Sequence, residues 1–410
     1  MYLTLLISNF LLILKKTHYS NNYLFMFSWL ITFLKFYIPI LFILLNLLYK
    51  RCSIYYKHLL YKDPTTGKII DVDKLYEPFR VKDKLTYWKF IIYGMIFFIP
   101  KSIICTSAVI GLIFHLKFAN VFYKNADKDI YQRNRIKNIV KFWTYLFLKG
   151  AMIQVKEKKS SNMKNIYKKY LGEDYDFEDK KYSLITSNHI GFFDVILVLH
   201  LHQPGFIAKM TVKDYPLFGS VARGIHCLFI NRESESARKK IMDDIYTRQK
   251  NFIEKQSLTP LAIFPEGTTT SNRHILKFKK GAFYHLLPIK PQIIKIDQNC
   301  PLHIACGVQN ILFHSLKIMT YPFVEMGYYD LPVIRPTKYM YEHYSKLGKE
   351  KWEIFAEVTR KIYCEIGGFE ESSYGFRDVD LYERSVLSGE YHPNSNKTIE
   401  LQEIKKEKNN

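Results

Sequence analysis

Residues 187–194 read SNHIGFFD and place His189 and Asp194 five positions apart, directly after the strand-like run of residues 184–186. A histidine removes a proton near neutral pH only when its tautomer and orientation are fixed, and a carboxylate that accepts from one ring nitrogen fixes both. On a regular helix five positions turn the chain by about 500°, so the two side chains would not share a face. We therefore predict His189 on the loop after a strand and Asp194 in the first turn of the next helix, with Gly191 letting the chain fold back.

Two further segments end strand-like runs in polar residues. Residues 224–232 read GIHCLFINR, a β-branched and aromatic run that ends in an arginine, and a guanidinium is a bidentate donor suited to phosphate. Residues 261–270 read LAIFPEGTTT, an apolar run that breaks at its proline and is followed by a glutamate. In open α/β sheets ligands bind in the crevice outside the carboxyl ends of the strands, so these segments should meet the histidine loop in one site. The residues expected there are His189, Asp194, Arg232, Glu266, Gly267 and Thr268.

Each of these residues also has a simpler explanation when it is taken alone. His189 and Asp194 would then be a solvated histidine and a capping aspartate, Arg232 half of a surface ion pair, and Glu266 an ordinary acid at a strand end. A fourth segment, LPIKP at residues 287–291, could be no more than a rigid turn before the next strand. The ordered combination of the four segments favours a functional site over these alternatives.

Together the four segments resemble the glycerolipid acyltransferase family. The pattern of that family runs from His-four-any-Asp, through a strand that ends in Arg and the sequence Phe-Pro-Glu-Gly-Thr, to a Val/Leu-Pro-Ile/Val segment. Residues 269–272 (TTSN) and 278–283 (FKKGAF) are similar to the lysophosphatidylcholine and lysophosphatidylethanolamine acyltransferase branch. Lysophosphatidic acid acyltransferases usually carry Asp before the arginine and Arg after Phe-Pro-Glu-Gly-Thr, where this chain has Asn231 and Thr269. The acceptor head group is therefore open.

The resemblance implies an enzyme that transfers an acyl group from acyl-CoA to a free hydroxyl of a lysophospholipid. His189, oriented by Asp194, would act as the general base, and acyl-CoA would be a substrate, with no cofactor and no metal. The resemblance also implies that the acceptor is bound by Arg232, Glu266, Gly267 and Thr268. Lys209 matches a position where relatives often carry a lysine near the acyl carbonyl, and a surface lysine is the simple alternative. Two other functional classes remain open. One is a glycerol-3-phosphate acyltransferase. The other is a catalytically silent membrane scaffold, and the presence of both His189 and Asp194 argues against the scaffold.

Composition favours a membrane enzyme. Of the 410 residues 48% are hydrophobic, and Lys35 is the only charged residue between Tyr23 and Tyr49, a stretch longer than the roughly 20 apolar residues that cross a bilayer. Residues 1–14 lack a basic start and a cleavage site, so we expect an uncleaved anchor rather than a signal peptide. Residues 87–116 are apolar but interrupted at Pro100, which predicts a two-helix membrane hairpin, with one kinked span as the alternative.

The net charge of +22 indicates anionic partners. No nucleic-acid-binding motif accompanies the lysines, so we expect no nucleic acid and attribute the charge to an anionic lipid bilayer and to substrate phosphates. The simpler alternative is that the base composition of the genome enriches the chain in lysine, and that these lysines only solvate its surface. The six cysteines have no paired short spacing, and His303 between Cys300 and Cys306 is expected to be a core residue rather than a metal ligand. Reduced thiols suggest a cytosol-facing active site, on a membrane that we expect to be the endoplasmic reticulum.

The predicted fold is α/β, with a central mixed sheet flanked by helices, preceded by N-terminal membrane helices and a membrane hairpin. A helix should cross between the second and third segments, because apolar residues recur at helical spacing from Ser234 to Gln256. The expected divisions are a membrane anchor (1–62), a linker with the hairpin (63–120), a helical and polar connection (121–180), the acyltransferase catalytic domain (181–367) and a C-terminal tail (368–410).

Overall fold

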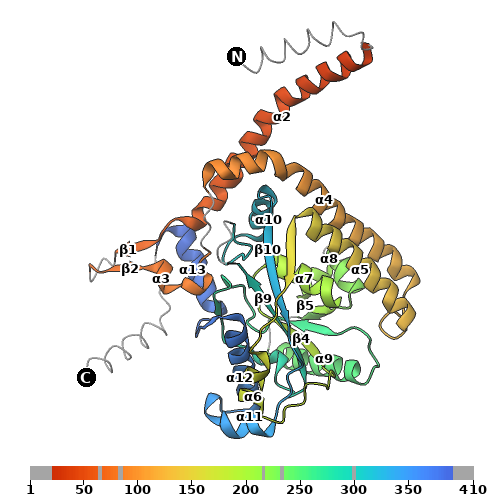
Figure 1. The fold of residues 1–410 in the computed structure, drawn as a ribbon, viewed down its shortest axis with the longest axis vertical. Coiled ribbons are helices and arrows are strands. Elements are labelled where there is room, and N and C mark those ends of the chain that lie inside the picture. The colour runs from red at the N-terminus through yellow and green to blue at the C-terminus, as the bar shows by residue number, and fades with distance from the viewer. Residues whose placement is uncertain are drawn as a thin grey trace.

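A seven-stranded mixed sheet organises the chain in the computed structural model (Figure 1). The structure describes residues 21–62, 67–81, 86–214, 218–230, 235–297 and 302–390. The strand order in the sheet is β3-β10-β9-β4-β7-β5-β6. Its strands are β3 (Ile153–Glu157), β4 (Leu184–Ser187), β5 (Gly205–Lys209), β6 (Leu228–Ile230), β7 (Leu261–Ile263), β9 (Ile289–Ile296) and β10 (Val324–Asp330). Two small sheets pair β1 (Leu60–Lys62) with β2 (Ile69–Asp71) and β8 (His274–Ile275) with β11 (Glu370–Glu371).

The central strands run parallel, and one edge of the sheet is mixed. β4 pairs in parallel with β7 and with β9, β5 pairs in parallel with β6 and β7, and β10 is antiparallel to β9 and parallel to β3. The prediction of a mixed sheet is therefore confirmed. Since β4 and β7 are parallel neighbours, their carboxyl ends deliver the next residues of both strands to the same edge of the sheet.

Helices cover both faces of the sheet. Those of the described chain are α2 (Asn21–Ser53), α3 (Val72–Leu75), α4 (Tyr87–Phe122), α5 (Ile130–Gly150), α6 (Met163–Leu171), α7 (Phe192–His202), α8 (Phe218–Gly224), α9 (Glu235–Ile253), α10 (Ile311–Thr320), α11 (Lys338–His343), α12 (Lys351–Gly367) and α13 (Phe376–Ser388). α9 confirms the helix expected between residues 234 and 256. β3 precedes the predicted catalytic region, yet it forms the edge of the same sheet.

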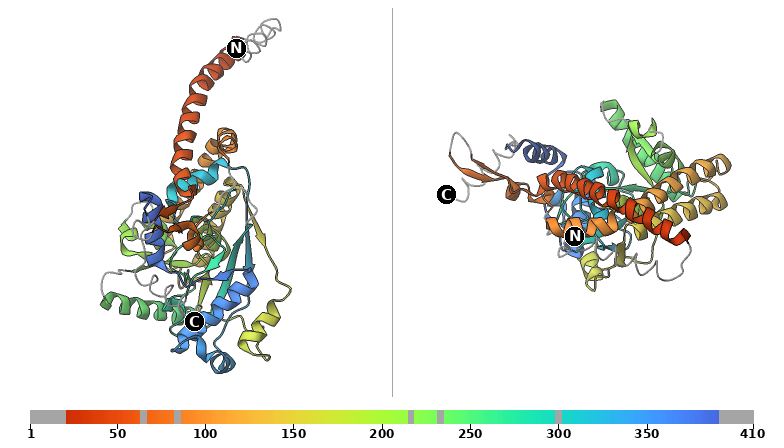
Figure 2. Two further views of the ribbon diagram at one scale, coloured as in Figure 1. Left: turned by 90° about the vertical axis from the view of Figure 1, so that its left-hand side faces the viewer. Right: turned by 90° about the horizontal axis from the view of Figure 1, so that it is seen from above.

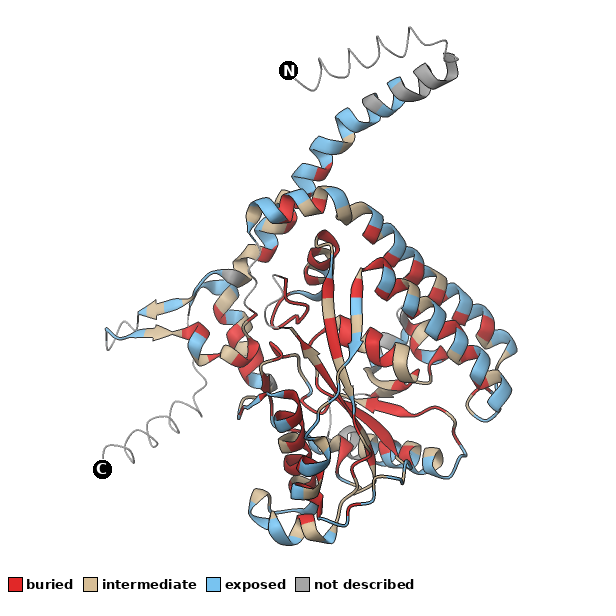
Figure 3. Cartoon of the chain, in the orientation of Figure 1, coloured by how far each residue is buried: buried red, intermediate tan, exposed pale blue. Residues whose placement is uncertain are grey.

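Alternate residues of the strands feed two separate cores. Leu184 of β4 and Leu261 of β7 face a core that α6 and α12 complete. Their neighbours Ile185 and Ala262 face the opposite core, which includes side chains of α5, α7 and α10. Because both faces of the strands are buried, the strands read as continuous apolar runs rather than as alternating patterns. Figure 3 shows this buried centre beneath helices whose outer faces are exposed.

Two helices of the described residues are long and apolar enough to cross a membrane by length and composition: residues 28–53 of α2 and the whole of α4. α2 extends away from the sheet domain (Figure 2), and its base packs against α4 through Leu41, Leu45 and Phe90. Most large side chains on α2 and on the outer face of α4 are exposed, including Trp29, Ile96 and Phe114. Contact of these apolar side chains with bilayer lipid would be more favourable than their contact with water.

The predicted break at Pro100 is wrong, because α4 continues through it as a single helix, which was the alternative. Proline removes one helical hydrogen bond, but the adjoining turn is fixed by Lys101. Its buried ammonium donates to the carbonyl oxygens of Ile318 (3.1 Å) and Tyr321 (2.6 Å) at the end of α10. Docking of this turn onto the sheet domain therefore stabilises the helix at the proline. The helical hairpin that forms instead consists of α4 and α5, which lie side by side (Figure 1).

A small cluster that we call the clasp joins the segment before α4 to the C-terminal helix α13. In the clasp Tyr382 donates from its hydroxyl to Asp73 (3.0 Å), whose carboxylate also pairs with Arg80. Tyr374 donates to the carbonyl of Leu75 at 2.6 Å. The apolar part of the clasp includes Val72, Tyr76, Phe79, Leu276, Val379 and Tyr382. The regions predicted as a linker and a tail thus contribute a packed cluster of their own.

Membrane attachment should survive the loss of α2. Deleting residues 1–53 removes α2 and leaves α4, whose 36 residues exceed the roughly 20 needed for a span. We expect the shortened chain to float with lipid in a density gradient. Adding Ile96→Lys and Ile103→Lys, on side chains that are 59% and 60% exposed, should release it without disturbing the core. Recovery of the shortened chain alone as a folded protein in the aqueous fraction would contradict an independent role for α4.

Candidate active site

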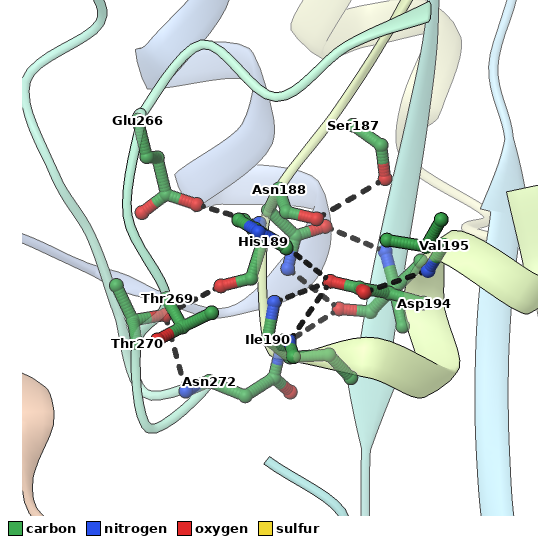
Figure 4. Close-up of polar contacts among 12 residues, drawn as sticks. Ser187, Asn188, His189, Ile190, Asp194, Val195, Glu266, Thr269, Thr270 and Asn272 are labelled. Atoms are coloured by element: carbon green, nitrogen blue, oxygen red, sulfur yellow. Dashed lines mark hydrogen bonds and ion pairs between the residues drawn. The ribbon is translucent and has the colours of Figure 1, made fainter. Parts of the chain in front are cut away.

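His189 and Asp194 form a hydrogen-bonded pair at the carboxyl end of β4, as the sequence predicts. His189 lies on the loop after β4, and Asp194 lies in the first turn of α7. The two side chains are joined by a 2.8 Å contact between Nδ1 of the imidazole and Oδ2 of the carboxylate (Figure 4). With Nδ1 engaged as a donor to the carboxylate, Nε2 is the basic nitrogen that remains for a substrate.

Asp194 is buried completely, and backbone amides surround its carboxylate. Oδ2 accepts from the N–H groups of Ile190 (2.5 Å) and Gly191 (3.2 Å), and Oδ1 accepts from the N–H of Val195 (2.7 Å). The start of a helix presents unpaired N–H groups and a partial positive charge, which compensate the burial of the anion. Gly191 is required here by space, because an added Cβ would lie 2.9 Å from Cβ of Cys306.

The surroundings of His189 favour its protonated form. Burial lowers the pKa of the imidazole, but the carboxylates of Asp194 and Glu266 outweigh burial and raise the pKa above the ordinary value of 6.5. The ring stacks on Phe264 with the ring centroids 4.3 Å apart, so its plane is fixed from the side as well. About a fifth of the side chain, 22%, remains exposed. The imidazole is therefore oriented, basic and reachable.

Glu266 supports the histidine loop from the neighbouring strand. It follows β7, is 1% exposed, and accepts from the backbone N–H of His189 through Oε1 and of Leu276 through Oε2, both at 2.9 Å. Burial raises the pKa of Glu266 to about 7, against the lowering effect of these two hydrogen bonds. Both oxygens are thus directed at the chain itself. The geometry favours a positioning role, whereas contact of Glu266 with an acceptor remains a prediction.

Two asparagines that the sequence reasoning missed tie the site to β9. Asn188 extends the pairing beyond the end of β4, since its side chain donates to the carbonyl of Ile294 (2.9 Å) and accepts from the N–H of Ile294 (2.7 Å). Asn272 donates to the same carbonyl (2.8 Å) and accepts from the N–H of Ile296 (2.8 Å). Both side chains are fully buried. The only signal in the sequence was that each asparagine adjoins a motif.

A cavity of about 1050 Å³ opens beside His189. Most of its described lining is apolar and comes from β5, β6, β7, α8 and α9, with Phe206, Ile230, Ile241 and Phe264 among the larger side chains. Gly267 also lines it, with a left-handed backbone (φ +70°) that favours glycine. Thr268, which is half-buried, is not among the described lining residues. The predicted acceptor residues 266–268 therefore differ in their access to this cavity.

Two predicted site residues have side chains outside the described part of the structure. Arg232 lies outside the described residues, as does Asn231, immediately after β6. Lys209 is the last residue of β5, two strands away from β4 in the sheet, and its side chain is outside the described part. Their substrate contacts remain predictions. Among the cysteines near the suggested metal pattern, Cys300 is outside the described residues, and Cys306 donates its thiol to the carbonyl of Gln309 at 2.9 Å.

A Glu266→Gln variant should have a lower unfolding temperature than the unaltered chain, and its affinity for ligands should be less affected than its stability. The amide offers one acceptor where the carboxylate offers two, so one of the N–H groups of His189 and Leu276 loses its partner at a cost of about 1–3 kcal/mol. We expect a lower unfolding temperature for the full chain in detergent. Glu254→Gln, at an exposed position, is the matched control and should unfold like the unaltered chain. Unchanged unfolding with weaker acceptor binding would instead assign Glu266 to the acceptor.

Comparison with known proteins agrees with the ordered segments. The sequence profile of the family described as Acyltransferase matches residues 152–296. Lysophospholipid acyltransferase LPEAT1 of Arabidopsis thaliana is 27% identical over 222 residues, which are 53% of this chain and 52% of the plant protein. Lysophosphatidylcholine acyltransferase of Drosophila melanogaster is 27% identical over 206 residues, or 49% of this chain and 36% of the fly protein. The matched part of this chain thus spans about half the length of the first relative and about a third of the second.

Among solved structures, the crystal structure of the 1-acyl-sn-glycerophosphate acyltransferase PlsC from Thermotoga maritima matches with a TM-score of 0.42 and 16% identity, over 66% of this chain and 92% of the bacterial one. The profile match covers the histidine loop, the strand that precedes Arg232, the loop of Glu266 and β9. The part of this chain that carries the candidate active site, residues 152–296, is thus similar to the family described as Acyltransferase and to relatives named as lysophospholipid acyltransferases.

Proposed function

We propose that this chain transfers an acyl group from acyl-CoA to a free hydroxyl of a lysophospholipid. The observation that carries the proposal is the oriented pair of His189 and Asp194 at the edge of a large and mainly apolar cavity. The curated relatives are named as acyltransferases that act on lysophospholipids, which supports the same class of acceptor. A fatty acyl chain is chemically suited to such a lining, since burial of each methylene contributes about 0.8 kcal/mol.

In the proposed reaction Nε2 of His189 removes the proton of the acceptor hydroxyl as its oxygen attacks the thioester carbonyl. The carbon–sulfur bond then breaks, the new ester remains, and the departing thiolate takes the proton back from the imidazolium. Asp194 holds the tautomer and stabilises the imidazolium through the 2.8 Å contact with Nδ1. No covalent enzyme intermediate is needed, so the chain has to position two substrates and one base.

The same proposal places the protein on a membrane. Both proposed lipid substrates partition into bilayers, and α2 and α4 carry exposed apolar faces that a bilayer would cover. Of the described cysteines, Cys105, Cys227, Cys306 and Cys364 are free thiols. Free thiols are typical of reducing compartments, which supports a site that faces the cytosol, at the endoplasmic reticulum in our proposal.

Replacing His189 with Ala should abolish acyl transfer while leaving abundance and membrane attachment unchanged. Loss of a general base typically reduces the rate by about 10²- to 10⁴-fold. The matched control is His343→Ala, since His343 is an exposed histidine on α11. The activity of both variants is measured as release of free coenzyme A by the full chain in lipid. The acceptors are a panel of lysophospholipids and glycerol 3-phosphate. Turnover near that of the unaltered chain by the His189 variant would refute the proposed base.

The rate should also depend on pH in a way that Asp194 controls. The base must be neutral to act, so activity should fall as the pH drops through the pKa of His189, which lies above 6.5. Asp194→Asn removes the carboxylate that raises this pKa and leaves the burial that lowers it. The acidic limb of the profile should therefore move to lower pH while the maximal rate falls. A limb that stays in place would assign the titration to another group, such as Glu266, whose pKa is about 7.

A further inference from the structure

Most of the described lining of the cavity beside His189 is apolar, but the lining also includes charged side chains. Among its described lining residues the basic side chains besides His189 are Lys279 and Lys280, and the acidic one is Asp243 of α9. Lys280 is held over the ring of Tyr284, with its ammonium 5.3 Å from the ring centroid. Lys279 is also exposed, but its side chain lies against Gly267 rather than over an aromatic ring.

Lys279 lies across the turn that supports the catalytic histidine. Its backbone N–H donates to the carbonyl of Pro265 at 2.9 Å, which fixes the residue beside the Glu266 turn. Its side chain then runs over Gly267, where an added Cβ would lie 2.4 Å from Nζ and 2.8 Å from Cε. The missing side chain of Gly267 thus leaves the path of the lysine open. The preceding residue, Glu266, accepts a hydrogen bond from the N–H of His189, and Gly267, Lys279 and His189 all line the same cavity.

Three polar residues of the loop after Gly267, Thr269, Thr270 and Ser271, make hydrogen bonds to other parts of the fold and do not line the described cavity. The hydroxyl of Thr269 donates to the carbonyl of Gly307 at 2.8 Å. The N–H of Thr270 donates to the carbonyl of His189 at 3.0 Å, and the N–H of Ser271 donates to the carbonyl of Pro78 at 2.8 Å. This stretch therefore fixes the loop, and the positive charge on this side of the described cavity comes from the two lysines.

We infer that Lys279 binds the phosphate of the lysophospholipid acceptor. The inference rests on the proposed function and adds a binding residue to it. In a lysophospholipid the free hydroxyl and the phosphate are separated by only a few bonds of the glycerol unit, so a hydroxyl at Nε2 of His189 places the phosphate close by. The phosphates of coenzyme A are separated from the thioester by the whole pantetheine arm. An ammonium next to the histidine turn therefore matches the acceptor, and a charge-assisted hydrogen bond to phosphate is a strong contact.

Binding to the purified full chain in detergent tests this assignment without requiring turnover. The probes are a short-chain lysophosphatidylcholine, the monoacylglycerol with the same acyl chain, and free coenzyme A. Lys279→Ala should weaken lysophosphatidylcholine binding about tenfold, as expected for loss of one partly exposed charge-assisted contact, and leave the monoacylglycerol and coenzyme A unchanged. Lys279→Arg should recover most of the affinity, because it restores the charge.

Lys277→Ala is the matched control, because Lys277 is exposed two residues away and lines a different surface hollow with Glu357 and Arg360. It should bind all three probes like the unaltered chain. Three results for Lys279→Ala would each overturn the inference. They are an equal loss of affinity for lysophosphatidylcholine and monoacylglycerol, a loss of affinity for coenzyme A alone, and no loss of affinity for any probe. Absence of acyl transfer in the unaltered chain would refute the proposed function, whereas the binding comparison would still decide the role of Lys279.

Discussion

The burial of one carboxylate, that of Asp194, determines how the site is built. An isolated ionised carboxylate cannot be buried without large cost, so it must be surrounded by donors. Here the donors are three backbone N–H groups at the start of α7 and Nδ1 of His189. The same contacts that make the anion tolerable therefore fix the loop, the helix start and the imidazole together. Glu266 repeats the principle from β7, with two backbone N–H groups as its partners.

Local patterns made part of the structure predictable. The placement of His189 on a loop and of Asp194 in a helical first turn followed from their spacing, and α9 followed from apolar periodicity. The α/β class of the fold followed from the alternation of strand-like and helix-like segments along the chain. These features depend on neighbours within a few residues, which a single sequence records. They sufficed to bring His189, Asp194, Glu266 and Gly267 to one edge of the sheet.

Other features depend on contacts between distant parts of the chain and could not be read from spacing. Asn188 finds its partner 106 residues later in Ile294. Glu266 looks like an exposed strand-end acid until β4 is placed beside β7 and supplies the N–H of His189. Pro100 is a helix breaker by propensity, yet the ammonium of Lys101 is held by the end of α10, more than 200 residues away, and α4 continues. Tertiary contacts outweighed local preference in each case.

The clasp has a consequence for the order in which the protein can be completed. The Glu266 loop rests on the segment before α4 through the Ser271–Pro78 hydrogen bond, and that segment is held in turn by Tyr374 and Tyr382. A ribosome makes the segment before α4 about 300 residues before α13, so the full set of contacts can close only after α13 has been synthesised. Until then the nascent chain would carry α2 and α4 without the contacts that hold the segment beneath the Glu266 loop, so the surroundings of His189 would be completed after those helices.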